Sequence, residues 1–321
     1  MENKDLRIVF MGTPVFAVES LKALLSSGKN VICVITAPDK PAGRGKKIQS
    51  SPVKDFACSH HIPVLQPANL KDPDFISSLT SYHPDMSVVV AFRMLPALVW
   101  ALPPMGTFNL HASLLPDYRG AAPVNWAVIN GEKETGVTTF LIDHEIDTGK
   151  ILLQEKTHID DKETAGDLHD RLMVMGAKVV VKTVDMLASG KVEPVPQASF
   201  QTGKVIKPAP KIFKENCRIN WEEPVEQVYN FIRGLSPYPA AFTELFSNAE
   251  KHQVKIYNAC KIKIKHHVHP GTIETDGKSV LRIAARGGYI DVKSLQLAGK
   301  KKLLIDEFLR GFLHIESFRA M

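Results

Sequence analysis

The first 35 residues of the chain combine two short apolar runs with a helical pattern between them. Leu6–Met11 is mostly apolar and is followed by Gly12, and Val31–Ile35 is rich in β-branched residues. Apolar residues recur at helical spacing from Val15 to Ser27. Two buried strands joined by a helix form a right-handed βαβ unit with parallel strands. This pattern restricts the fold to the α/β class.

The same alternation continues over roughly 190 residues. We expect further strands at Val64–Leu65, Met86–Phe92, Thr107–His111, Val137–Ile142 and Lys150–Leu153, and helices at Pro52–Cys58, Asp72–Leu79, Ala122–Ile129 and Glu163–Leu187. This order predicts a doubly wound, mostly parallel sheet of the Rossmann-like type.

A second, smaller domain is predicted after a proline-rich stretch. Gly190–Pro210 contains four prolines and no helical period, which is typical of a linker. Beyond it, one helix is expected at Pro224–Ile232, with short alternating segments at Val254–Tyr257, Ile262–Ile264, Leu281–Ala284 and Tyr289–Val292. We therefore predict a catalytic domain at 1–189, a linker at 190–210 and an OB-like β-barrel at 211–321.

Composition excludes several classes of protein. The four cysteines form no CxxC pair, which argues against a zinc ribbon or a disulfide framework and fits a reducing compartment. No apolar run approaches the ~20 residues of a membrane helix, and no secretory signal or Arg-rich presequence is recognisable. We expect a cytoplasmic protein. His266, His267 and His269 lack further ligands nearby, so we expect no metal site there.

Positive charge is concentrated in the C-terminal part. Residues 1–200 carry a net charge of −2 and residues 201–321 carry +8. A glycine-containing loop adds a second basic group, made of Lys40, Arg44, Lys46 and Lys47. Such charge is typical of contact with a polyanion, although charge alone equally fits solvated surfaces.

The glycine-rich phosphate-binding motifs are absent. The first strand-to-helix turn reads Gly12-Thr13-Pro14, without the GxGxxG spacing of dinucleotide-binding proteins. No GxxxxGK[ST] motif occurs either. A nicotinamide-dependent dehydrogenase and a P-loop hydrolase are therefore disfavoured.

The densest group of reactive side chains follows the predicted strand Thr107–His111. Strand alternation places Asn109 and His111 on one face, at the sheet edge where α/β proteins bind ligands. Histidine can transfer a proton, and an asparagine amide can stabilise an oxyanion. Three carboxylates could orient the histidine: Asp143, Glu145 and Asp147. Because no GxSxG nucleophile motif occurs, we expect an acceptor to attack directly; a purely structural role for these residues is the alternative.

Several motifs together resemble the folate-dependent formyltransferases. They are Asn109-x-His111-x-Ser113-Leu114-Leu115-Pro116, Tyr118-Arg119-Gly120-Ala121-Ala122-Pro123, Glu134-Thr135-Gly136-Val137-Thr138 and Asp147-Thr148-Gly149. The resemblance continues more loosely through Ala209-Pro210-Lys211-Ile212. One departure lies at Phe92–Pro96, where Arg93 stands in place of a family glycine and the segment is one residue shorter.

The resemblance implies a function and a set of site residues. It implies transfer of a formyl group from 10-formyltetrahydrofolate to the amino group of methionine on initiator tRNA, for translation initiation, without a metal. The implied catalytic residues are Asn109, His111 and Asp147. The implied folate contacts are Phe92, Leu95, Ser113, Leu114, Leu115, Pro116 and Asp143, and the implied tRNA contacts are Lys40, Arg44, Lys46, Lys47 and Lys211. We expect a monomer with no membrane partner.

Two alternatives remain at this point. One is a formyltransferase that acts on a small amine, such as an amino sugar or a purine precursor. The other is a non-catalytic RNA-binding protein built on a former enzyme. The basic loop and the basic second domain argue against the first, and the complete set of three polar residues argues against the second.

Overall fold

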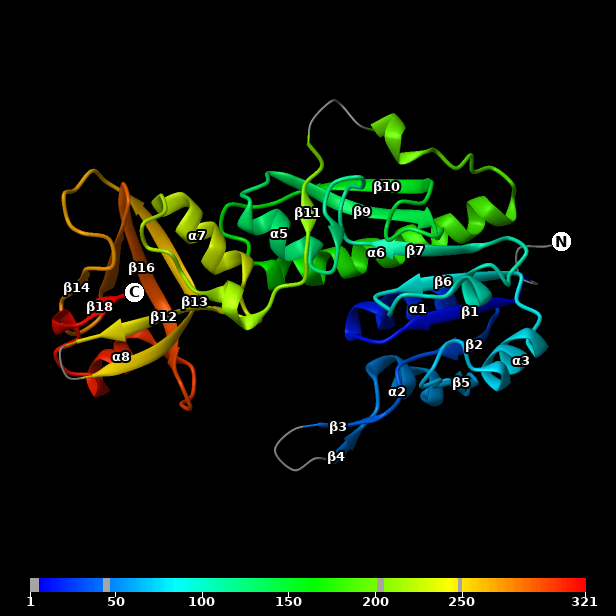
Figure 1. Cartoon of the computed structure of the whole chain (residues 1–321), viewed down its shortest axis with the longest axis horizontal. Coiled ribbons are helices and arrows are strands. Elements are labelled where there is room, and N and C mark those ends of the chain that lie inside the picture. Colours follow the sequence, from blue (N-terminus) through cyan, green and yellow to red (C-terminus); the bar gives the residue numbers. More distant parts are fainter. Residues whose placement is uncertain (1–5, 43–46, 201–204, 248–249) are drawn as a thin grey trace. The chain divides into compact units, whose positions relative to one another are not determined.

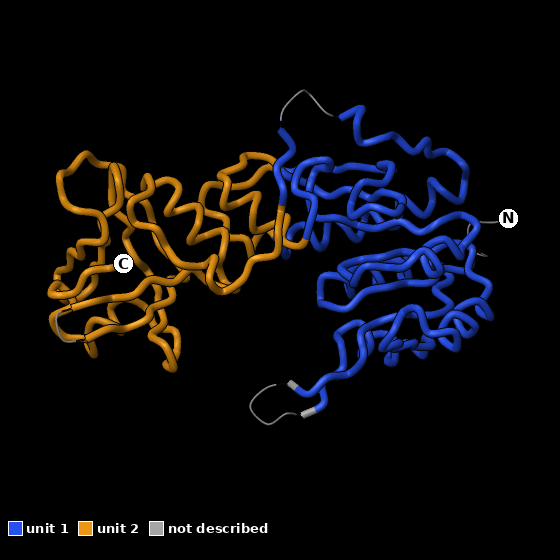
Figure 2. Tube along the Cα trace, viewed as in Figure 1, with its two compact units in different colours: residues 1–120, 135–157, 169–208 blue, residues 121–134, 158–168, 209–321 orange. Residues whose placement is uncertain are grey.

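The computed structural model describes residues 6–42, 47–200, 205–247 and 250–321. The chain forms two compact units, each assembled from three segments (Figure 2). Unit 1 comprises residues 1–120, 135–157 and 169–208, and unit 2 comprises residues 121–134, 158–168 and 209–321. The domain limits at 189 and 211 follow chain order and stay a prediction.

A seven-stranded sheet forms the centre of unit 1, in the order β10-β9-β7-β6-β1-β2-β5 (Figure 1). Its strands are β1 (Ile8–Gly12), β2 (Val31–Ile35), β5 (Val64–Leu65), β6 (Met86–Val90), β7 (Thr107–His111), β9 (Glu134–Leu141) and β10 (Ile151–His158). The pairs from β7 through β5 are parallel, whereas β9 runs antiparallel to β7. The predicted doubly wound, mostly parallel sheet is confirmed.

Helices cover both faces of this sheet. They are α1 (Val15–Ser26), α2 (Pro52–Ser59), α3 (Pro73–Ser81), α4 (Ala97–Trp100) and α6 (Ala165–Ala188). Strand alternation sends Val9 and Met11 into a core cluster with Phe75 of α3 and Val99 of α4. On α6, Gly176 lies against Leu110 of β7, where a Cβ would come within 2.7 Å of the leucine side chain. Every residue of β1 and β6 is buried, as expected for strands covered on both faces.

Helix starts follow the capping rules that the sequence suggests. Ser51 accepts a hydrogen bond from the Lys54 backbone N–H at 3.1 Å, and proline occupies the first turn of α2. Asp72 caps α3 in the same way through the backbone N–H of Asp74. Both helices therefore begin within a residue of their predicted positions.

The basic loop after β2 contains a short hairpin that the sequence did not predict. Strand β3 (Lys40–Ala42) pairs antiparallel with β4 (Lys47–Gln49). Lys40 is exposed at the start of this hairpin. Arg44 and Lys46 lie outside the described residues, as does the side chain of Lys47.

Unit 2 contains an antiparallel sheet that closes into a barrel, as predicted. Its order is β14-β15-β16-β13-β12-β18, with β17 beside β16. The strands are β12 (Ala241–Phe246), β13 (Lys251–Lys263), β14 (Ile273–Thr275), β15 (Leu281–Ala285), β16 (Gly288–Leu297), β17 (Leu303–Leu304) and β18 (Arg319–Ala320). The two ends of this order meet, because Thr272 bridges Arg319 and the Ala320 N–H donates to Gly271 O at 2.8 Å. Helices α7 (Val225–Gly234) and α8 (Ile305–Gly311) bury apolar side chains in the barrel core.

Strand β13 differs from the prediction of two short strands. It runs unbroken through both predicted segments, and Ile264 lies beyond its end. Its register against β16 shifts twice between Ile256 and Ala259. Such bulges insert residues that break the strict alternation, so one strand resembled two.

Helix α5 (Pro123–Ile129) belongs to unit 2 because it packs on α7. The Asn125 side chain donates to Gly234 O at 2.7 Å. A Cβ on Gly234 would lie 2.6 Å from the Ile129 side chain, so glycine permits this close approach. Nearby, the buried Arg233 donates to the carbonyls of Asp160 and Glu163, which ties residues 158–168 to the same unit. No helix in the described part of the chain is both long and apolar enough to span a membrane.

Candidate active site

Strand β7 presents the predicted pair of polar residues at its carboxyl end. His111 is 6% exposed, and its Nε2 lies 2.8 Å from the Tyr118 carbonyl oxygen. A carbonyl oxygen only accepts, so Nε2 carries a proton and donates. The other ring nitrogen, Nδ1, is therefore the one that can accept a proton in the neutral imidazole.

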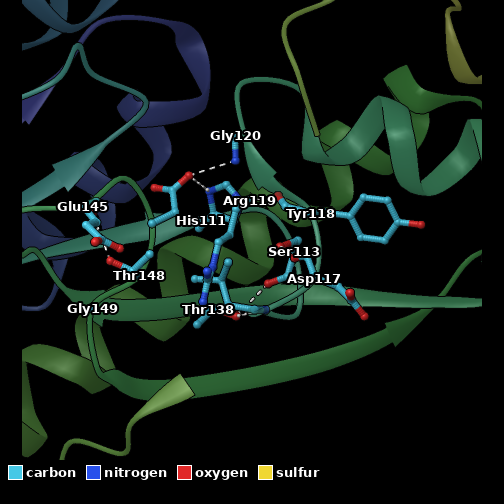
Figure 3. A network of polar contacts seen from close by, with 12 residues as sticks. His111, Ser113, Asp117, Tyr118, Arg119, Gly120, Thr138, Glu145, Thr148 and Gly149 are labelled. Carbon is cyan, nitrogen blue, oxygen red and sulfur yellow. Dashed lines mark hydrogen bonds and ion pairs between the residues drawn. The ribbon is translucent and has the colours of Figure 1, made fainter. Parts of the chain in front are cut away.

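The structure brings one of the three candidate carboxylates to this histidine. Asp147 Oδ2 lies 3.8 Å from His111 Nδ1 and accepts a hydrogen bond from the Gly120 N–H at 3.0 Å (Figure 3). Asp143 instead stabilises its own loop, where it accepts from Glu145 N and from the Thr148 hydroxyl. Spacing alone left the three carboxylates open, and Asp147, which the resemblance implies, is the one that lies near the histidine.

Tight packing holds the loop that carries Asp147. The residue has a φ of +55°, a left-handed conformation that asparagine and aspartate adopt more readily than other non-glycine residues. Two residues on, a Cβ at Gly149 would lie 1.6 Å from Leu141 O, so only glycine fits there. The loop is thus specified by backbone contacts as well as by its side chains.

Asn109 lies on the same face of β7 as His111, as the strand period predicts. Its side chain is half-buried, and among the residues that the structure describes it has no hydrogen-bond partner. An amide in this position has both N–H groups available for a ligand.

The loop after β7 is held by hydrogen bonds to β9 and β10. The Thr138 hydroxyl donates to Ser113 O at 2.7 Å, and the Gln154 amide donates to Leu115 O at 2.7 Å. Ser113, Leu115 and Pro116 are buried, whereas Leu114 is half-buried. The structure therefore gives the first three a part in shaping the loop and leaves Leu114 partly open to a ligand.

The segment Phe92–Pro96 shows what the departure at Arg93 does. The guanidinium lies 5.7 Å from the centre of the Phe92 ring and donates to the carbonyls of Ala68 and Pro67. Arg93 thereby ties this segment to the loop after β5. Leu95 is 9% exposed and packs in the sheet core, while Phe92 is half-buried at its edge.

Sequence reasoning missed Gln197, which lies in the short 3₁₀ helix Gln197–Phe200 within the predicted linker. Its side-chain N–H groups donate to Asp147 O and Gly149 O, both at 2.9 Å. Its carbonyl oxygen accepts from Arg119. The sequence offered no signal that singles out this glutamine within the proline-rich stretch.

Two groups of lysines in unit 2 differ in their contacts. Lys261 and Lys263 both contact the Glu226 carboxylate of α7. Burial raises the pKa of this carboxyl, but hydrogen bonds from the two lysines outweigh burial and hold the pKa below its usual value. Lys211 is exposed beside the Phe213 ring and lines a cavity of about 370 Å³ with Lys214 and Lys255. Within this second group Lys211 and Lys214 are exposed, whereas Lys255 donates to Pro239 O at 2.9 Å.

Of the three histidines that follow β13, His266 has structural contacts. His266 Nε2 lies within 3.0 Å of the carbonyls of Ala285 and Gly288, and its ring packs on Tyr289. Within the described residues, no group of three or more His, Cys, Asp or Glu side chains could hold a metal ion.

Comparison with known proteins places this chain in one family. Residues 6–184 match the family described as formyl transferase, and residues 211–313 match the formyl transferase C-terminal domain. The chain is 55% identical over 320 residues to a methionyl-tRNA formyltransferase of Bacteroides fragilis, with 99% of each chain covered. It is 49% identical over 314 residues to the enzyme of that name from Flavobacterium psychrophilum, with 98% of each covered. The chain belongs to the formyl transferase family.

Solved structures agree at the level of the fold. HypX from Aquifex aeolicus in complex with tetrahydrofolic acid aligns with a TM-score of 0.64 at 18% identity, covering 96% of this chain and 48% of HypX. The sugar 3N-formyl transferase WlaRD aligns with a TM-score of 0.63 at 20% identity, covering 92% of this chain and 99% of WlaRD.

Proposed function

We propose that this chain transfers the formyl group of 10-formyltetrahydrofolate to the α-amino group of methionyl initiator tRNA, which produces the formylmethionyl-tRNA used in translation initiation. The identity of 49–55% to relatives of that name, over nearly the whole of both chains, carries the proposal. The pairing of His111 with Asp147 beside an uncommitted Asn109 amide supports formyl transfer as the chemistry.

The mechanism assigns each of the three polar residues a role. The neutral amine of the methionyl group attacks the formyl carbon, and an oxyanion develops on the formyl oxygen. The Asn109 amide donates to that oxyanion, a contribution typically worth ~3 kcal/mol of barrier. His111 accepts the proton of the attacking nitrogen at Nδ1, because Nε2 already donates to Tyr118 O.

The same imidazole then returns the proton to N10 of the folate as the carbon–nitrogen bond breaks. Atoms and charge balance, since the amine loses one proton and N10 gains one. Asp147, 3.8 Å from Nδ1, stabilises the positive charge that the ring carries between the two steps. We assign the folate to the loops that contain Phe92, Leu95, Ser113, Leu114, Leu115, Pro116 and Asp143.

We propose that the tRNA contacts exposed basic residues, among them Lys40 and Lys211. A small formyl acceptor would need neither the basic hairpin loop nor a second domain with a charge of +8 over residues 201–321. We further propose that the protein acts as a monomer in the bacterial cytoplasm, without a membrane partner.

A formylation assay tests this function. The purified chain is incubated with 10-formyltetrahydrofolate in three parallel reactions. Each reaction contains one acceptor: methionyl initiator tRNA, free methionine or an amino sugar. We expect formylation of the charged tRNA at a kcat/KM more than about a hundredfold above that of free methionine, since remote tRNA contacts contribute to transition-state binding. Preference for a small amine, or no transfer at all, would contradict the proposal.

Lys211→Ala is expected to raise the KM for the charged tRNA by about three- to tenfold and to leave the KM for the folate unchanged. Loss of one phosphate contact also reduces the salt dependence of tRNA binding, by a slope of about 1. The measurement is KM at several salt concentrations, with Lys278→Ala as the control, because Lys278 is an exposed lysine in a turn of the same unit. Equal effects of the two substitutions would show that only overall charge matters.

A further inference from the structure

A buried glutamine links the two segments that hold the proposed catalytic histidine. Gln197 is 4% exposed and begins the short 3₁₀ helix Gln197–Phe200, which follows α6 in the chain. Both of its amide N–H groups donate, one to Asp147 O and one to Gly149 O. Its carbonyl oxygen accepts from Arg119 Nε at 3.1 Å and from Nη2 at 2.6 Å. Every hydrogen-bonding position of this side chain is therefore occupied.

The two residues whose oxygen atoms face the His111 ring nitrogens both have left-handed backbones. Tyr118, whose carbonyl accepts from Nε2, has a φ of +62°, and Asp147, whose carboxylate faces Nδ1, has a φ of +55°. Non-glycine residues are uncommon in this region and persist where the surroundings hold them. Gln197 contacts Asp147 directly and reaches the Tyr118 segment through Arg119.

Gln197 is itself held firmly by the sheet of unit 1. Two residues earlier, Val195 pairs antiparallel with Ile151 of β10 through hydrogen bonds of 2.8 and 2.9 Å. The pairing with β10 therefore fixes where the Gln197 side chain meets the loop at residues 147–149. The four hydrogen bonds satisfy this buried amide fully and fix the direction in which its donors and its acceptor point.

We infer that Gln197 is a positioning residue for formyl transfer, which fixes the distance and direction of the Asp147 carboxylate relative to His111 Nδ1. The inference rests on the proposed function. Gln197 contacts neither reacting group, so it acts on the chemical step through Asp147 and leaves substrate binding unchanged.

Gln197→Glu separates the two halves of this network. A glutamate keeps an acceptor for Arg119 but loses both donors to the loop, and its carboxylate repels the carbonyls of Asp147 and Gly149. We expect kcat to fall about thirtyfold, because an error near 1 Å at a catalytic group can cost up to about 10²-fold. The KM values for folate and charged tRNA should stay within about twofold.

The deciding measurement is a double-mutant cycle with Asp147→Asn, followed by single-turnover kinetics. In the Asp147→Asn background, where the carboxylate charge is gone, adding Gln197→Glu should lower kcat by less than about twofold. A similar thirtyfold loss of kcat in both backgrounds would overturn the inference about Gln197 and leave the proposed function intact. If Asp147→Asn by itself keeps the original kcat, the catalytic assignment of Asp147 is wrong and the inference falls with it.

Gln296→Glu serves as the matched control. Gln296 lies on β16 of unit 2, where it accepts from the Tyr257 hydroxyl at 2.6 Å and donates to Lys300 O at 2.7 Å. The same chemical change there should leave kcat unaltered. If Gln197→Glu fails to fold, Arg119→Lys interrupts the network from the other side. An unchanged kcat in that folded variant would overturn the inference.

Discussion

Replacing His111 by glutamine is expected to lower kcat for formyl transfer by about a thousandfold. The substitution removes the group that accepts a proton at Nδ1, and general acid–base catalysis contributes about 10²–10⁴-fold. A glutamine amide can still donate to Tyr118 O, as Nε2 now does, so the loop after β7 keeps one of its contacts. The measurement is single-turnover formylation of charged tRNA at saturating folate.

His60→Gln provides the control for this experiment. His60 is exposed at the end of α2, where its ring contacts Ser59 and Phe56 of the same helix. Its replacement should leave kcat and the melting temperature unchanged. A His111→Gln variant that turns over within about tenfold of the original would refute the role assigned to His111.

Asp147→Asn is expected to lower kcat by about a hundredfold while the protein stays folded. Asparagine has nearly the same shape, and its side-chain oxygen can still accept from the Gly120 N–H. What disappears is the negative charge 3.8 Å from His111 Nδ1, which stabilises the ring when it is protonated. The readouts are kcat, both KM values and the melting temperature.

Asp170→Asn is a suitable comparison, since Asp170 is 76% exposed and pairs with His169 on the surface of α6. Exposed pairs of this kind contribute little. If the two aspartate variants had the same kcat, the charge of Asp147 would have no specific role in the reaction.

The sequence predicted most of unit 1 because its strands are fully buried and its helices are amphipathic. The position of Asn109 and His111 followed from the period of a strand and from the rule for ligand sites in α/β sheets. The pairing of His111 with Asp147 could not be derived from spacing, because it depends on a left-handed backbone at Asp147 and on the packing of Gly149. Only the family resemblance selected this carboxylate.

Contacts between residues far apart in the chain account for what was missed. Gln197 reaches Asp147 from 50 residues away, through a segment without any regular pattern. Lys261 and Lys263 look like a basic strand face in the sequence, yet both contact Glu226 on a preceding helix. The bulges in β13 disturbed the alternation on which strand prediction relies.

The packing of α5 on α7 affects the order in which the chain can fold during translation. It also limits which fragments of the chain can keep all of their contacts. During translation, α5 leaves the ribosome well before α7, so its contact with Gly234 must wait for the later segment. A fragment that starts at residue 211 would lack Asn125 and the carbonyl groups that receive Arg233. Cleavage at a single peptide bond therefore cannot release the barrel with all of its partners, and separate expression of the two halves would yield an incomplete C-terminal piece.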